Sequence, residues 1–164
     1  MTVDELMARE QIRDVIAKYA IAGDQLDIEA FVHTFAEHGV LEMPRECPCG
    51  RAAIRAWVTT TQPFGDETRR PTSVRHHITS SLIDFNPPDA PSARAYFVVL
   101  TDVGLDHSGY YVDRFGREDD QWLFAHRRVE FFGARSTASS RLRTCLSDKQ
   151  VRPELASPLA KSGL

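Results

Sequence analysis

The feature that most constrains the fold of this chain is a change in the spacing of its apolar residues. Over residues 4–60, apolar side chains recur every three or four positions, which is typical of amphipathic helices. Over residues 74–132 they recur at every second position, which is typical of strands. Helices followed by a run of strands, instead of alternating with them, predict an α+β domain with a curved, mostly antiparallel sheet.

The expected elements follow from this pattern together with its Gly, Pro and Asp punctuation. Helices are expected over residues 4–23, 27–36 and 52–60, and a short strand over 40–43. The long strands are expected over residues 74–85, 93–105, 109–115 and 122–132. Residues 61–72 combine prolines, a glycine and charges, so we expect a loop that could cover the mouth of a cavity.

Length and charge limit the classes of protein to consider. The 164 residues, 42% of them hydrophobic, suffice for one domain with its own core. We assign residues 1–135 to this domain and residues 136–164 to a C-terminal tail that is either loose or packed on a partner subunit. The net charge of −3 and the lack of a basic stripe argue against nucleic acid as a partner.

The sequence also carries no signal for membranes, metals or common cofactors. Charges run through the first 20 residues, and no later apolar run reaches the ~18 residues of a membrane span. Together with an odd number of cysteines, this favours the cytoplasm. Cys47-Pro48-Cys49 lacks a second cysteine pair, so a plain turn is favoured over a metal site. Without a phosphate loop or nucleophile elbow, we expect neither metal nor cofactor.

The strand over residues 74–80 contains the most informative polar residues. Alternation places Val74, His76 and Ile78 on one face and Arg75 and His77 on the other. Because the first face is apolar, His76 should point inward and His77 outward, and the two cannot share a zinc site. His76 is then either a site residue or a core histidine whose ring nitrogens are hydrogen-bonded.

Other polar residues lie in apolar surroundings. Tyr19 lies on the apolar face of the first helix, and Asp24 follows near its end, where a capping or surface role would be ordinary. Arg127 follows a bulky apolar run in the last strand, where an arginine is costly unless it is paired. Asp113 is its natural partner, and a structural ion pair at the rim of the sheet is favoured over a catalytic role.

These residues together resemble a known family, over roughly residues 4–133. The matching motifs are Ile16-x-x-Tyr19, Asp24-x-x-Asp27, Phe31-x-x-x-Phe35, Arg75-His76-His77, Gly109-x-Tyr111-x-Asp113 and Trp122-x-Phe124 leading to Arg127-Arg128. In this order they resemble SnoaL-like proteins of the nuclear transport factor two superfamily. Its members include scytalone dehydratase, bile acid dehydratase and ketosteroid isomerase.

The resemblance implies a cone-shaped barrel in which the sheet and the N-terminal helices enclose one apolar pocket. It also implies that Asp24 and His76 form a catalytic pair and that Tyr19 is a pocket tyrosine. The candidate substrate-binding residues are Trp57, Tyr111, Asp113 and Arg127. The implied activity is that of a cofactor-independent lyase or isomerase, in which His76 removes a proton beside a carbonyl group. Its substrate would be a small hydrophobic molecule, polyketide-like, aromatic or steroidal.

Two alternatives remain open at this level. The chain could be the non-catalytic small subunit of a ring-hydroxylating dioxygenase, which shares the fold, or a protein that binds a small molecule without transforming it. We also expect a homo-oligomer, most simply a dimer. The half-exposed sheet bears Tyr96, Phe131 and Phe132, which leave apolar surface for a partner to cover.

Overall fold

The computed structural model describes residues 1–60 and 72–132. The expected tail, residues 136–164, lies outside the described residues, as does the expected covering loop apart from Thr72. The boundary of the domain and the packing of the tail therefore stay predictions.

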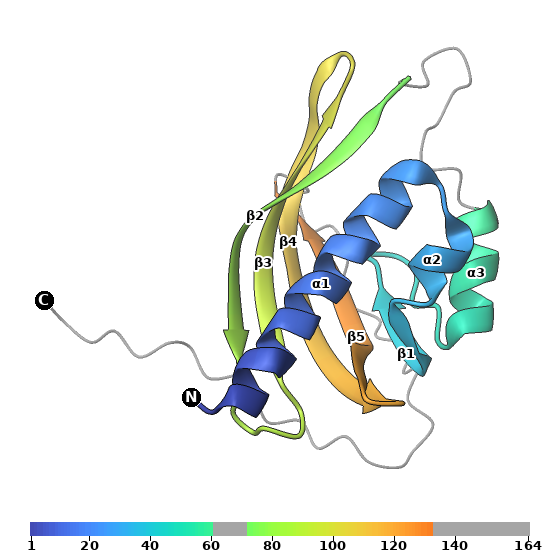
Figure 1. Cartoon of the computed structure of the whole chain (residues 1–164). Helices are drawn as coiled ribbons and strands as arrows, with labels where there is room; N and C mark the ends of the chain where they lie inside the picture. Colours follow the sequence, from blue (N-terminus) through green and yellow to red (C-terminus); the bar gives the residue numbers. More distant parts are fainter. Residues whose placement is uncertain (61–71, 133–164) are drawn as a thin grey trace, which may run out of the picture.

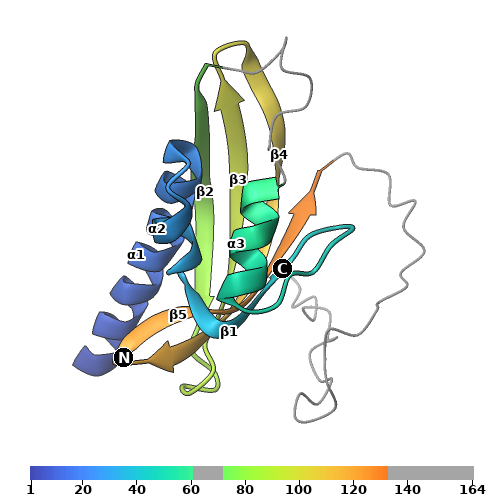
Figure 2. The same ribbon diagram turned by 90° about the vertical axis from the view of Figure 1, so that its right-hand side faces the viewer.

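The structure confirms an α+β domain in which helices precede a sheet. The elements are α1 (Val3–Gln25), α2 (Ile28–Val32), β1 (Phe35–Glu42), α3 (Arg51–Thr60), β2 (Val74–Asp84), β3 (Ser92–Thr101), β4 (Gly104–Glu118) and β5 (Gln121–Phe131). The sheet has the order β1-β5-β4-β3-β2, and β1 runs parallel to β5 while the other neighbouring pairs are antiparallel. It curves around α1, and α3 stands over the same side of the sheet (Figures 1 and 2).

The helix expected over residues 27–36 is shorter than its apolar pattern suggests. It ends at Val32, and β1 begins at Phe35. The Thr34 hydroxyl donates to the Phe31 carbonyl at 2.6 Å, and the Thr34 carbonyl accepts from the Phe124 backbone at 2.9 Å. Hydrogen bonding to β5 thus replaces a further helical turn, and it places Phe35 in the core.

The β3–β4 hairpin also differs from its expected form. β3 ends at Thr101 and β4 starts at Gly104, so the strands turn over Asp102 and Val103 instead of residues 106–108. Gly104 has a φ of 117°, which only glycine adopts without strain. As a result, His107 lies within β4 and not in a turn.

The ends of α1 are defined by local hydrogen bonds. The Thr2 side chain caps the first turn by accepting from the Glu5 backbone at 3.1 Å. At the other end Leu26 adopts a left-handed conformation with a φ of 57°. Asp24 therefore lies in the last turn of the helix, beside the sheet.

A buried ion pair lies at the centre of the concave face of the sheet. Arg127 on β5 is directly opposite Asp113 on β4, with an Nε–Oδ1 distance of 2.8 Å and an Nη2–Oδ2 distance of 2.7 Å. Both side chains are fully buried. The predicted pairing is confirmed, but its predicted place at the rim is wrong, because Tyr19 and Phe124 cover the guanidinium at 4.1 and 3.9 Å.

The ion pair with Asp113 also keeps the buried Arg127 side chain protonated. Burial acts to lower the pKa of Arg127, and the Asp113 charge with its two hydrogen bonds more than offsets this, so the pKa is raised. The guanidinium therefore stays charged across the whole working range of pH.

Within residues 1–60 and 72–132, no helix combines the length and the apolar character that a bilayer span requires.

Replacing Asp113 with asparagine should strongly destabilise the fold. The substitution leaves the Arg127 charge buried without a counter-ion, which costs about 3–5 kcal/mol of the free energy of unfolding. Urea denaturation measures the loss. Glu29→Gln, which breaks an exposed ion pair with Arg55, is the control and should cause little change. Equal losses in both variants would contradict this account of the core.

Candidate active site

The predicted pairing of Asp24 with His76 is present in the structure. His76 Nδ1 lies 2.6 Å from Asp24 Oδ1, and the His76 backbone N–H donates to both carboxylate oxygens at 3.1 Å. The pair joins the last turn of α1 to the start of β2. Because a carboxylate oxygen accepts the hydrogen bond, Nδ1 carries a ring proton, and in the neutral form of the ring Nε2 has the lone pair.

The position of Asp24 explains why it needs these donors. A carboxylate in the last turn of a helix faces the negative end of the helix dipole, which disfavours its charge. The two N–H groups of His76 compensate this cost with charge-assisted hydrogen bonds. The Asp24 side chain is 10% exposed and that of His76 is 25% exposed, so the carboxylate is shielded while part of the ring stays accessible.

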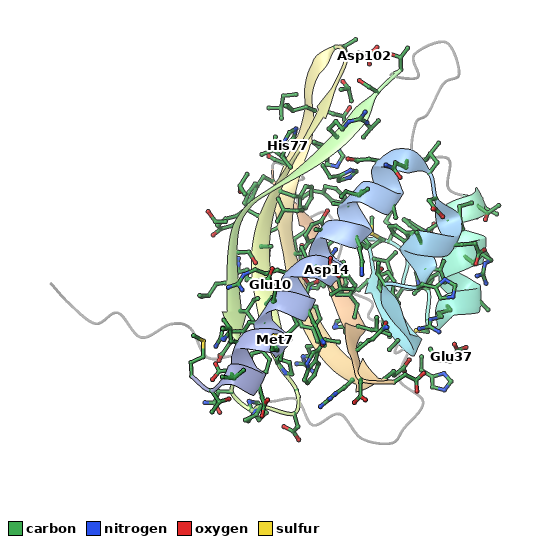
Figure 3. The ribbon with its side chains drawn as sticks, in the orientation of Figure 1. Met7, Glu10, Asp14, Glu37, His77 and Asp102 are labelled. Carbon is green, nitrogen blue, oxygen red and sulfur yellow. The ribbon has the colours of Figure 1, made fainter. Side chains whose placement is uncertain are left out.

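His77 lies on the opposite side of β2. It is exposed, whereas His76 is half-buried, as the alternation predicts. Figure 3 shows His77 on the side of the sheet away from α1. The inference that the two histidines do not share a site is therefore confirmed.

Two tyrosines lie in the core near the pair. Tyr19 is 9% exposed, with its ring centroid 4.5 Å from that of Phe31 and 5.9 Å from that of Tyr111. Tyr111 is 2% exposed and stacks on Phe97 at 4.5 Å. Burial raises the pKa of both hydroxyls, and the Asp24 carboxylate adds to the effect on Tyr111. Both therefore remain neutral phenols.

The other predicted substrate-binding residues are not gathered around His76. Asp113 and Arg127 bind each other and expose no surface, so neither can touch a substrate in this conformation. Trp57 lies half-buried on α3, and its indole N–H has no hydrogen-bond partner among the described residues. Of this group, Tyr111 is the residue whose pKa is raised by burial and, to a smaller extent, by the charge of Asp24.

The structure adds a residue that the sequence analysis did not select. The His107 ring centroid lies 6.4 Å from that of His76, and His107 Nδ1 lies 2.5 Å from Asp106 Oδ2. His107 was not selected because it fell between the expected strands over residues 93–105 and 109–115, so that no face of the sheet could be assigned to it. The signal that could have revealed it is the pair of turn-forming residues Asp102 and Gly104, which favours a tighter hairpin.

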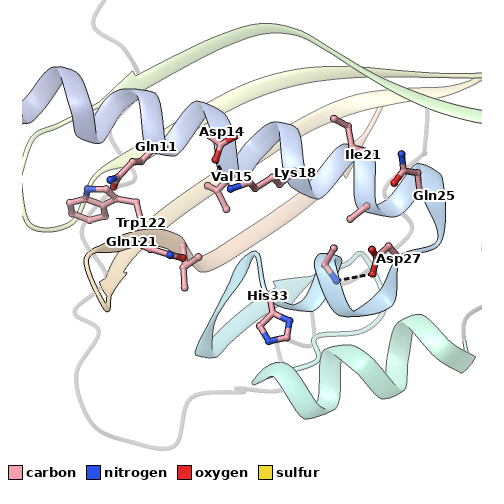
Figure 4. Close-up of a pocket in the computed structure, with 13 residues that line it drawn as sticks. Gln11, Asp14, Val15, Lys18, Ile21, Gln25, Asp27, His33, Gln121 and Trp122 are labelled. Carbon is pink, nitrogen blue, oxygen red and sulfur yellow. Dashed lines mark hydrogen bonds and ion pairs between the residues drawn. The ribbon is translucent and has the colours of Figure 1, made fainter.

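A groove of about 540 Å³ lies away from the Asp24–His76 pair, between α1, α2 and the start of β5 (Figure 4). Its walls include Asp14 and Lys18, which form a 2.6 Å ion pair, together with His33 and Gln121. This mixed, open groove differs from the apolar pocket that was expected around His76, and that pocket stays a prediction.

In the described part of the chain, no three His, Cys, Asp or Glu side chains converge as metal ligands would.

Comparison with known proteins agrees with the order of the motifs. The profile of the SnoaL-like domain matches residues 4–128, most of the chain. The chain belongs to the SnoaL-like family. A search of the curated proteins finds no match for this SnoaL-like protein.

Solved structures with the same fold include three at low sequence identity. A nuclear transport factor two-like protein with a cystatin-like fold, from Novosphingobium aromaticivorans, is 24% identical (TM-score 0.69; 80% of this chain and 86% of that one). A protein from the same species, provisionally named a scytalone dehydratase, is 20% identical (0.66; 80% and 88%). ActVI-ORFA from Streptomyces coelicolor is 22% identical (0.65; 76% and 96%). At these identities the likeness shows the fold alone, and it confirms the expected cone.

The buried tyrosines should make the protein sensitive to alkali. Because the pKa values of Tyr19 and Tyr111 are raised in the folded state, their contribution to stability is complete below the unfolded value of about 10. It is lost as the pH rises above that value, since the unfolded chain releases these protons first. Urea denaturation from pH 8 to 11 should show the loss, and Tyr111→Phe should reduce it. A Tyr111→Phe profile that parallels the parent would contradict this assignment.

Proposed function

We propose that this SnoaL-like protein is a cofactor-independent lyase or isomerase that acts in the cytoplasm on small hydrophobic carbonyl compounds. The observation that carries the proposal is the Asp24–His76 pair, a partly exposed imidazole whose tautomer is held by a shielded carboxylate. This is the arrangement that a general base requires, because the carboxylate fixes one ring nitrogen and the other is left for a substrate.

In the proposed reaction His76 Nε2 takes a proton from the carbon beside the carbonyl group. The positive charge that develops on the ring is stabilised by Asp24, which need not take the proton itself. The electron pair of the broken C–H bond then expels a leaving group from the next carbon, or it is reprotonated elsewhere. The first outcome is an elimination such as dehydration, and the second is an isomerisation.

The oxygen of the substrate carbonyl gains negative charge during this step and needs a hydrogen-bond donor. Tyr19 and Tyr111 stay protonated, as such a donor must. Only 9% of the Tyr19 surface is exposed. Tyr19 can therefore serve in this role for a substrate that enters the core next to Asp24 and His76. The aromatic side chains around it favour an apolar, planar substrate of the polyketide, aromatic or steroidal kind.

The name given to one of the similar structures supports this class of chemistry. One of them is provisionally called a scytalone dehydratase, and dehydration is the elimination described above. A binding protein of the same fold would hold the same molecules and leave them unchanged. Turnover by the purified chain separates the two possibilities.

We also propose that the protein is a homodimer that pairs through the outer face of the sheet. Tyr96, Tyr110 and Phe132 form an aromatic cluster there, with ring centroids 5.7–6.5 Å apart. Tyr96 and Phe132 are 42% and 54% exposed. Phe131, which we had grouped with them, packs instead on the inner face against Phe97. A second copy suits the face because charges of both signs flank the cluster, Arg94 over Tyr110 and Glu130 paired with Arg128, and a twofold axis can place opposite charges across from each other.

Replacing His76 with glutamine should abolish most of the activity on an aromatic hydroxyketone that the parent protein dehydrates. General-base catalysis is worth roughly 10²–10⁴-fold in kcat, and Asp24→Asn should cause a loss of similar order because an amide cannot stabilise the ring charge. His77→Gln, on the outer face of the same strand, is the matched control. Full turnover by folded His76→Gln would overturn the mechanism, and binding without turnover by the parent would favour a binding protein.

Introducing charge on the outer face should separate the dimer. The double variant Tyr96→Glu/Phe132→Glu should have half the mass of the parent in light scattering at tens of micromolar protein, because two like-charged carboxylates would meet their copies. Met7→Glu, at a similarly exposed apolar site on α1, should leave the mass unchanged. A monomeric parent protein would reject the proposal.

A further inference from the structure

The groove between α1, α2 and the start of β5 combines an apolar floor with amide groups on its rim. Four buried apolar side chains line it: Val15, Ala22, Trp122 and Leu123. Three exposed glutamines border it: Gln11, Gln25 and Gln121 (Figure 4). An amide side chain both donates and accepts hydrogen bonds, so this rim suits the N–H and C=O groups of a peptide backbone. Trp122 adds an aromatic surface of the kind on which proline rings pack.

The groove is elongated, because a second hollow of about 290 Å³ continues it along α1. The two hollows share Gln11 and Asp14. The second one extends to Met7 and Glu10, which precede Asp14 along the helix (Figure 3). From Met7 to Gln25 the helix rises about 27 Å, which is the length of about eight residues of extended chain. We call the two hollows together the α1 groove.

The chain itself contains a segment of opposite charge. Residues 133–164, which follow β5, contain six Lys and Arg residues but two Asp and Glu residues, a formal charge of +4. The first 132 residues contain 14 and 21, a formal charge of −7. Of the Asp, Glu, Lys and Arg side chains along the α1 groove, Glu10, Asp14 and Asp27 are acidic and Lys18 is basic. A basic segment is therefore attracted to the groove.

Residues 149–161 are the part of this segment that matches the groove best. Val151, Leu155 and Leu159 follow one another at intervals of four. In an extended chain, residues separated by an even number lie on the same side. The two prolines of this stretch favour an extended backbone over a helix. From Val151 to Leu159 such a backbone measures about 26 Å, close to the length of the groove. Three basic side chains and one acidic one make the stretch basic.

The chain is long enough for this stretch to reach the groove. β5 leads from Leu123, which lines the groove, to Phe131, so the segment starts at most about 30 Å away. For a tether of 19 residues, from Phe132 to Val151, the expected end-to-end distance is about 24 Å. A tether that matches the distance gives an effective concentration on the order of millimolar. A segment with a Kd of about 0.1 mM is then roughly 90% bound, so weak contacts suffice.

We propose that residues 149–161 bind as an extended peptide in the α1 groove of their own chain. The three apolar side chains cover the floor of the groove, and the glutamines of the rim bond to the backbone between them. The basic side chains face the acidic groups of the groove. Because the groove ends at Gln25 and Asp27, the bound segment also holds the junction of α1 and α2 next to Asp24. The inference is independent of the reaction proposed for His76.

Nuclear magnetic resonance of the full chain, labelled with ¹⁵N, tests the proposal. Leu155→Ser/Leu159→Ser should shift the amide signals of the residues that line the α1 groove, because it empties the groove. Leu142→Ser/Leu146→Ser, with the same spacing in the same segment, is the matched control and should leave these signals in place. A synthetic peptide of residues 149–161 should bind the first variant about tenfold more tightly than the parent, whose groove is occupied.

The other results overturn the inference. If neither double variant shifts the groove signals, or if both shift them equally, the groove does not hold this stretch. Shifts around Tyr96 instead of the groove would assign the segment to the outer face of the sheet. Equal affinity of the peptide for parent and variant would show that the groove of the parent is open.

Binding between copies is tested by adding unlabelled parent protein to labelled Leu155→Ser/Leu159→Ser. Groove signals that return to their parent positions would assign the segment to the groove of a neighbouring copy and contradict binding within one chain. Should this variant not fold, Lys149→Glu/Arg152→Glu/Lys161→Glu decides the question by the same signals, because it reverses the charge that attracts the segment.

Discussion

The rest of the structure depends on the buried charge of Arg127. Its guanidinium lies between the rings of Tyr19, Tyr111 and Phe124 at 3.9–4.1 Å, and Asp113 neutralises it through two hydrogen bonds. Such a charge is tolerated only where partners and packing are complete. Meeting that requirement brings α1, β4 and β5 together at one point, because each contributes a side chain to it. One donor, Nη1, has no hydrogen-bond partner in the described residues, and the surrounding ring faces compensate part of its cost.

The candidate site lies next to this buried cluster around Arg127. Tyr19 contacts the guanidinium, and Asp24 follows five residues later on the same helix, a rise of about 7.5 Å. The packing of Tyr19 therefore determines how far Asp24 reaches toward β2, where His76 binds it. The same β-sheet carries His107 to the other side of the site. A stability determinant and a candidate catalytic pair are thus linked through one helix.

Much of the fold and half of the site could be predicted, and the reason is periodicity. Alternation over residues 74–80 places His76 inward and His77 outward without any tertiary information, and the motif order led to Asp24. The places where prediction failed are element ends, where local preference and pairing compete. Phe35 continues the apolar spacing of the preceding helix, but the backbone hydrogen bond between Thr34 and Phe124 of β5 makes it the first residue of β1. His107 has the surroundings of a turn and becomes part of β4 because the hairpin closes at Asp102 and Val103.

The sequence by itself determined the class of the fold, the face on which each strand residue lies and the need of Arg127 for a partner, because these follow from local spacing and from the cost of burying charge. Only the tertiary structure decided that Asp24 binds His76 across 52 residues, that Arg127 lies in the centre and not at the rim, and that His107 faces His76. These facts depend on strand register and on the path of α1 over the sheet, which are set by the packing of many side chains together. No short segment contains that information.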